Sequence, residues 1–94
     1  MQENVKEELD TIKEMVQRWK KSYLGWASPD GENEYLLEEL SEEISRHVSP
    51  LIRRLHDGSH IDQFEAHEFL EYCYGQLEDL RNELKKVERQ DQSN

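Results

Sequence analysis

Apolar residues recur every three or four positions along most of the chain, which is the spacing of one face of an α-helix. The first stripe is narrow, with acidic side chains at its start and basic ones near its end, the order that the helix dipole favours. Its members are Val5, Leu9, Ile12, Val16, Trp19 and Tyr23. Residues 25–31 then contain two glycines and a proline, which are typical of a loop. We therefore predict a helix over residues 3–24.

A second stripe predicts a helix over residues 33–57, with Asn33 or Asp30 available to cap its start. The stripe consists of Leu36, Leu37, Leu40, Ile44, Val48, Leu51, Ile52 and Leu55. Pro50 lies inside it. Proline has no backbone N–H and crowds the preceding turn, so we expect this helix to be kinked or broken near Pro50.

A third helix is predicted over residues 60–89. Asp62 and Glu65 have the spacing of a capping box, which opens a helix. The apolar face is broad over residues 64–77 and becomes heptad-like afterwards. Its members are Phe64, Phe69, Leu70, Cys73, Leu77, Leu80, Leu84 and Val87. Residues 90–94 are polar, and we expect them to form a frayed tail.

These three helices predict a single all-α domain over residues 1–94, an antiparallel three-helix bundle with long, coiled-coil-like helices. The net charge of −10 comes mainly from two acidic blocks, residues 28–48 and 59–80. An up-down-up bundle places both blocks level with basic segments, which favours this arrangement over one extended coiled coil. Because the apolar stripes of the first and third helices are narrow, a single chain covers its own hydrophobic core poorly. We therefore expect a homodimer formed through one of them.

Composition excludes several classes of function. The only cysteine, Cys73, cannot form an intramolecular disulfide, and no apolar run approaches the ~18 residues of a membrane span. No targeting segment is visible, so we expect a cytoplasmic protein that binds no membrane. A net charge of −10 repels the phosphates of nucleic acids, so we also expect no direct binding to DNA or RNA.

Three histidines, His56, His60 and His67, flank the predicted turn before the third helix, and imidazole is a common ligand of transition metals. Their spacing matches no established ligand set. His56 and His60 are separated by a glycine turn, and none of the chain's histidines completes the Glu-x-x-His motif of di-metal bundles. We therefore expect solvated histidines, with no metal and no cofactor.

Two pairs of glutamates resemble the magnesium-binding pattern of the all-α MazG-like nucleotide pyrophosphohydrolases. They are Glu39-x-x-Glu42, preceded by Glu38, and Glu65-x-x-Glu68, where the family has aspartate at the last position. The resemblance implies an enzyme in which four carboxylates hold magnesium. The competing interpretation is that these residues form acidic, solvated helix faces, which is the commoner meaning of such charge runs. The enzyme is kept as a less favoured alternative.

Aromatic residues gather around the first predicted loop, and Trp and Tyr are the residues that most often anchor protein interfaces. We take Trp26, Tyr23 and Tyr35 as the leading contact residues and Trp19 as a further one. Trp19 and Tyr23 can equally cap the core, because both belong to the first stripe. Gly75, inside the third helix, costs about 1 kcal/mol relative to alanine, which suggests close approach by another helix.

The sequence thus predicts a small, acidic, non-catalytic helical module that binds another protein or itself, as an adaptor, chaperone-like protein or regulatory subunit. The alternative is an acidic mimic of nucleic acid that blocks a basic groove. A mimic needs a row of carboxylates without basic partners. The candidates for such a patch are Glu38, Glu39, Glu42, Glu43, Glu78 and Asp79.

Overall fold

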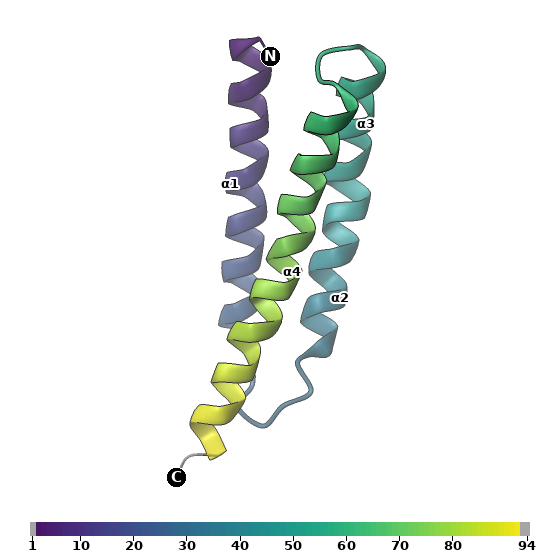
Figure 1. Cartoon of the computed structure of the whole chain (residues 1–94). Coiled ribbons are helices and arrows are strands. Elements are labelled where there is room, and N and C mark those ends of the chain that lie inside the picture. The colour runs from purple at the N-terminus through teal and green to yellow at the C-terminus, as the bar shows by residue number, and fades with distance from the viewer. Residues whose placement is uncertain (1, 93–94) are drawn as a thin grey trace.

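The computed structural model describes the backbone of residues 2–92 and the side chains of residues 2–89. This part of the chain forms three long helical rods and no β-strand (Figure 1). The elements are α1 (Glu3–Gly25), α2 (Glu34–Glu43), the π-helical turn η1 (Ile44–Val48), α3 (Ser49–Asp57) and α4 (Gln63–Gln92). Because α2, η1 and α3 follow one another without a gap, they make one rod, and the predicted all-α bundle of three helices is confirmed.

Each rod runs antiparallel to the one before it, so α1 and α4 are parallel to each other (Figure 1). α1 and α4 pack against each other, and both pack against the second rod. The bundle measures 54 × 20 × 19 Å. The loop of residues 26–33 closes one end and the turn of residues 58–62 closes the other. Three long seams between rods therefore make up much of the surface.

The core runs along the bundle axis, where the predicted apolar stripes meet. Its fully buried members include Val16 from α1, Leu40 from α2, and Cys73 and Leu80 from α4. The narrow stripe of α1 is covered within a single chain, since Val5, Leu9, Ile12 and Val16 are all buried. This removes the reason for expecting a homodimer through the stripe of the first helix, and the homodimer itself stays a prediction.

Pro50 does not break the second rod, whose backbone is helical from residue 34 to residue 57. The helix instead widens into a π-turn directly before the proline, and the amide of Ser49 donates a hydrogen bond to the carbonyl of Ile44, five residues earlier. In an α-helix, the proline ring would clash with the carbonyl four residues back. π-helical turns are rare and occur mostly as single turns inside α-helices, and the wider turn here relieves that crowding.

The turn after α3 is a Schellman motif whose left-handed residue is Ser59, at φ +60°, and not the neighbouring Gly58, at φ −83°. The amide of Ser59 donates to the carbonyl of His56 at 3.0 Å, and the amide of His60 donates to the carbonyl of Leu55 at 2.9 Å. These two bonds occupy residues 59 and 60 in the turn, so the predicted start of the third helix at residue 60 is wrong by three residues.

The predicted capping box forms at the start of α4. The amide of Glu65 donates to Asp62 Oδ1 at 2.7 Å, and the amide of Asp62 donates to Glu65 Oε1 at 3.0 Å. At its other end α4 reaches Gln92, three residues beyond the predicted end, because residues such as Gln and Arg readily adopt helical backbone. Residues 90–92 are thus helical and not frayed, and residues 93–94 lie outside the described part of the chain.

Ser59→Gly is expected to raise the free energy of unfolding by about 1 kcal/mol. A side chain in the left-handed region costs about 1–2 kcal/mol, and the greater freedom of glycine in the unfolded chain offsets part of the gain. Ser22→Gly makes the same change on the exposed, helical part of α1 and should instead lose about 0.5 kcal/mol. Urea denaturation of both variants measures this, and equal losses would contradict the left-handed conformation of Ser59.

Candidate functional site

Two surface hollows lie between the second rod and α4, and no residue of α1 lines either of them. The larger, which we call the α3–α4 groove, has a volume of about 780 Å³. Its lining consists of Ser49, Ile52, Arg53, His56, Gln63, Phe64, Ala66, His67, Leu70 and Tyr74. The smaller, the α2–α4 hollow, has a volume of about 610 Å³ and lies nearer the 26–33 loop. The hydroxyl oxygens of Ser45 and Tyr74 approach to 3.3 Å between them. We call the two hollows together the α2/α3–α4 seam.

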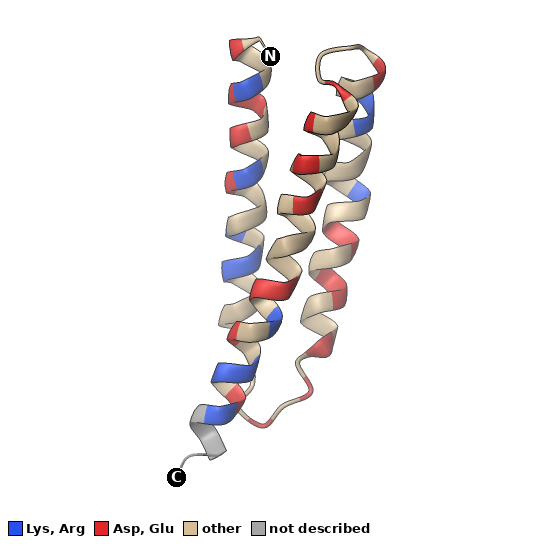
Figure 2. Ribbon diagram, viewed as in Figure 1, with Lys and Arg blue, Asp and Glu red and all other residues tan. Residues whose placement is uncertain are grey.

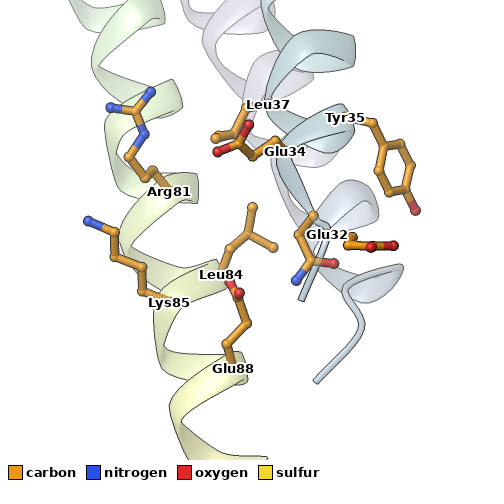
Figure 3. Close-up of a pocket in the computed structure, with 9 residues that line it drawn as sticks. Glu32, Glu34, Tyr35, Leu37, Arg81, Leu84, Lys85 and Glu88 are labelled. Atoms are coloured by element: carbon orange, nitrogen blue, oxygen red, sulfur yellow. The ribbon is translucent and has the colours of Figure 1, made fainter. Parts of the chain in front are cut away.

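The α2–α4 hollow has charged walls (Figure 3). Arg81 and Lys85 extend from α4, while Glu34 belongs to the first turn of α2 and Tyr35 stands at the outer edge. Leu84 is part of the floor. Both signs of charge are present here, so this hollow does not select strongly for the charge of a ligand.

Most of the exposed large hydrophobic side chains lie along this seam. Four such side chains are exposed in the described part of the chain: Trp26 at 69%, Phe64 at 68%, Tyr35 at 51% and Tyr74 at 39%. Phe64 and Tyr74 line the α3–α4 groove, and Tyr35 lines the α2–α4 hollow. Phe64 and Tyr74 share one groove, and exposed apolar groups gathered in this way are typical of sites of protein contact. The seam is therefore the candidate functional site.

The other aromatic candidates lie away from the seam. The rings of Tyr23 and Trp26 meet edge to face with centroids 6.2 Å apart, and Tyr23 is half-buried. Trp19 is also half-buried and packs against the core, with its ring 6.2 Å from that of His47. Gly75 is exposed, and a Cβ built there would meet no atom within 4 Å. No helix of the same chain approaches Gly75 closely, so packing within the bundle does not require glycine there.

The six acidic candidates are divided between α2 and α4, and three of them form ion pairs with lysine or arginine. These pairs are Glu42 with Arg46, Glu78 with Arg81 and Asp79 with Lys20. Glu43 lies 3.4 Å from His47 Nε2, a contact that is an ion pair only when the imidazole is protonated. Glu38 and Glu39 are exposed and form no ion pair with any described residue. Figure 2 shows acidic residues along α2 and the first part of α4, and basic residues on α3 and the last part of α4. A long unpaired row of carboxylates does not form among these residues.

Side chains near the C-terminal end of α1 contact both of the other rods. Lys20 Nζ lies 2.5 Å from Asp79 Oδ2, which is the one ion pair between different rods among residues 2–89. In the bundle the side chain of Lys20 thus turns toward α4. Tyr23 faces α2 instead: burial, and then the negative charges of Glu43 and Glu39, raise the pKa of its hydroxyl.

The three candidate histidines stay on the surface around the turn. His56 and His67 line the α3–α4 groove from its two sides. His56 Nδ1 lies 3.7 Å from a carboxylate oxygen of Asp57, and His67 Nε2 lies 3.1 Å from one of Glu71. Within the described residues, no three or more His, Cys, Asp and Glu side chains are grouped so that they could hold a metal ion. His56 and His67 therefore contribute to the groove as polar surface groups.

The glutamates that resemble the pyrophosphohydrolase pattern are not brought together. Glu39 and Glu42 lie on α2, whereas Glu65 and Glu68 lie in the first two turns of α4, toward the other end of the bundle. Glu65 and Glu68 face α1, where they line a small hollow with Lys6 and other residues. The described residues therefore offer no four-carboxylate magnesium site, because the hairpin of α3 and α4 sets the two pairs at different levels.

Cys73 is fully buried, and burial raises the pKa of its thiol to about 11, although the charge of Lys13 acts in the opposite direction. Since the thiolate is the nucleophile, the native thiol is inert near neutral pH. Iodoacetamide is expected to label Cys73 at least about tenfold more slowly in the native protein than in urea. Mass spectrometry measures both rates, and equal rates would contradict the burial.

Two side chains of the seam, Phe64 and Tyr74, are not among the interface residues that the sequence predicts. Phe64 belongs to the predicted apolar stripe of the third helix, and Tyr74 lies outside that stripe. The sequence does contain a signal for an exposed apolar surface here. The apolar face of residues 64–77 is broad, and one neighbouring helix cannot cover all of it.

No helix in the described part of the chain has both the length and the apolar character needed to cross a membrane. Comparison with known proteins gives no match: no family model fits the chain, and no curated protein and no solved structure is significantly similar to it. The geometry and chemistry of the surface are therefore the basis for assigning a function.

Proposed function

We propose that this chain is a non-catalytic protein-interaction module that binds a partner protein through the α2/α3–α4 seam. The observation that carries the proposal is that three of the four exposed large hydrophobic side chains, Tyr35, Phe64 and Tyr74, line this one seam. Grooves between neighbouring helices commonly receive a further amphipathic helix. An adaptor or regulatory subunit would use the seam in this way.

The exposed aromatic side chains supply the driving force for binding. Burying a large apolar side chain contributes about 1.5–3 kcal/mol, and Phe64 is 68% exposed in the free chain. Ile52 and Leu70 extend the apolar surface along the floor of the α3–α4 groove. Such a cluster of anchors around a well-packed floor is the usual arrangement of an interface hot spot.

A cytoplasmic location is part of the proposal. It is supported by the single cysteine, Cys73, whose buried, protonated thiol suits a reducing compartment.

Self-association stays a prediction without an assigned surface. Val5, Leu9, Ile12 and Val16 of the α1 stripe, which suggested a homodimer, are buried within one chain, and two copies that each carry a charge of −10 repel each other. Size-exclusion chromatography with light scattering at several protein concentrations measures the mass. A monomer throughout that range would contradict the predicted homodimer, and this result would leave binding to another protein unaffected.

The acidic mimic of nucleic acid is the less well supported function. It needs carboxylates held in a row without basic partners. Among the residues described, three of the six candidates form ion pairs with lysine or arginine, Glu43 lies beside His47, and only Glu38 and Glu39 have no such neighbour. Exposed pairs are weak, at about 0.2–1 kcal/mol, so the surface stays acidic. The unpaired carboxylates among these candidates, however, do not form a row that matches the phosphates of a nucleic-acid backbone.

Affinity capture from extracts of cells that express the protein tests the proposal, with the captured proteins quantified by mass spectrometry. The baits are wild type, Phe64→Ala and Trp26→Ala; the two variants remove almost equally exposed aromatics from different surfaces. We expect a partner that wild type and Trp26→Ala retain at about 0.1 M and about 1 M salt, because apolar anchors are insensitive to screening. Phe64→Ala should lose it. Loss with Trp26→Ala and retention with Phe64→Ala would place the interface at the first loop and contradict the proposal.

A further inference from the structure

We infer that the α3–α4 groove binds an amphipathic helix of a partner protein, with Asp or Glu side chains flanking the apolar stripe of that helix. This inference rests on the proposed function, because it names the chemistry of the partner for the same seam. It depends on the charge of the groove lining, which differs from that of the rest of the chain.

The α3–α4 groove contains no carboxylate among its lining residues, although the chain has 22 acidic residues against 12 basic ones. Its basic groups are Arg53, His56 and His67, and its one other titratable group is the phenol of Tyr74. Four other hollows on the described part of the surface each have at least one carboxylate in their lining. The groove is therefore a locally non-acidic strip on a strongly acidic molecule.

The polar groups of the groove flank an apolar floor. Ile52 is 1% exposed and Leu70 is half-buried, so both lie low between the two helices. Arg53 and His56 are exposed on the α3 side, and His67 is exposed on the α4 side. A helix lying on this floor would place its own flanking side chains against these two walls. Carboxylates on both flanks would meet N–H groups on both walls.

Arg53 is the group that most directly favours a carboxylate. Both groove histidines already have a carboxylate nearby, Asp57 for His56 and Glu71 for His67. Arg53 forms no ion pair with any residue whose side chain the structure describes. A guanidinium can donate two parallel hydrogen bonds to one carboxylate, a geometry that a lysine cannot reproduce.

The surrounding charge makes this preference selective. A partner helix with acidic flanks is repelled by most of a surface of charge −10 and finds a favourable position at the groove. A helix with basic flanks would be attracted to the acidic faces of α2 and the start of α4, and would be repelled at Arg53. Complementarity of this kind fixes the partner and its register more than it adds affinity.

Two synthetic helical peptides test the inference. Both carry the same Leu and Phe stripe; one has Glu at the flanking positions and the other has Lys. Fluorescence anisotropy measures affinity, and amide chemical shifts of the protein locate the site. We expect the Glu-flanked peptide to bind the α3–α4 groove roughly tenfold more tightly than the Lys-flanked one at low salt, as loss of a charged hydrogen bond would predict. The difference should shrink at about 1 M salt.

Charge reversal at neighbouring positions provides the matched control. Arg53→Glu should reverse the preference, so that the Lys-flanked peptide binds more tightly. Arg54→Glu makes the same change one residue later, on an exposed side chain that lines the hollow between α1 and the second rod, and should leave the preference unchanged. Circular dichroism confirms that each variant is folded.

The outcomes separate failure of the inference from failure of the proposed function. Equal binding of both peptides at the groove, lost in both cases with Phe64→Ala, would overturn the charge preference and leave the apolar interface intact. Absence of any shift at the groove, or occupation of the groove by a second copy of the chain at rising concentration, would also overturn the inference. If, in these cases, the Phe64→Ala bait still fails to capture a partner that wild type captures, the proposed function stands.

Discussion

Leu40→Ala is expected to lower the free energy of unfolding by about 3 kcal/mol, within the usual range of about 2–5 kcal/mol for truncating a buried leucine. Leu40 lies on α2, which packs against both α1 and α4, and it has no exposed surface. The substitution removes apolar contacts and leaves a cavity at the centre of the bundle. Urea denaturation followed by circular dichroism measures the change.

Leu37→Ala is the matched control, since Leu37 is on the same helix but only half-buried. Its side chain lines the α2–α4 hollow, where water can replace part of the lost contact. We expect a loss of less than half that of Leu40→Ala. Equal losses would contradict the core position of Leu40. The test is sensitive, because a chain of this length has a total stability of only about 5–14 kcal/mol.

Asn33→Ala is expected to cost about 2 kcal/mol, the second largest effect. Asn33 is 4% exposed, and its side chain closes the loop between α1 and α2. Oδ1 accepts a hydrogen bond from the amide of Ser28 at 2.8 Å, and Nδ2 donates one to the carbonyl of Ser28 at 2.9 Å. Alanine would leave the amide of Ser28 without this partner, whereas the carbonyl of Ser28 would keep the hydrogen bond that the amide of Gly31 donates at 3.2 Å. A buried group left unpaired costs about 1–3 kcal/mol.

The loop needs this clamp because its backbone is unusual. Gly31 and Glu32 are both left-handed, at φ +97° and +62°, and the conformation at Glu32 is unfavourable for a residue with a side chain. Asn82→Ala is the control, since Asn82 is exposed on α4 and alanine suits a helix. Thermal and urea denaturation compare the two variants. A loss for Asn33→Ala within about 0.5 kcal/mol of the control would contradict the clamp.

The positions of the helices could be predicted from local sequence, because the signals are themselves local. Apolar spacing identified all three rods. The Asp62 and Glu65 pair identified the cap of α4, although the predicted helix started before it. Asn33 shows the limit of such reasoning. It was expected to cap α2, and it does occupy the N-cap position, but its side chain bonds back to Ser28 and makes no capping bond. Both uses are typical of asparagine, so only the folded loop decides between them.

Other features depend on tertiary structure. Whether Pro50 breaks the second rod depends on whether the preceding turn can widen. Lys20 pairs with Asp79 because of the position of α1 relative to the other two rods. Phe64 belongs to an apolar stripe but is 68% exposed, because a stripe defines a face and does not say which other element covers it. The candidate site could not be predicted in full for the same reason.

The central claim is that a partner protein occupies the α2/α3–α4 seam. Photocrosslinking in cells tests it most directly, with a photoreactive phenylalanine analogue placed at Phe64, at Trp26 and at Glu14, three exposed positions on different surfaces. We predict one discrete protein adduct from position 64 that is weak or missing from positions 26 and 14, with the partner peptide identified by mass spectrometry. The absence of an adduct from position 64, or equal adducts from all three positions, would contradict the claim.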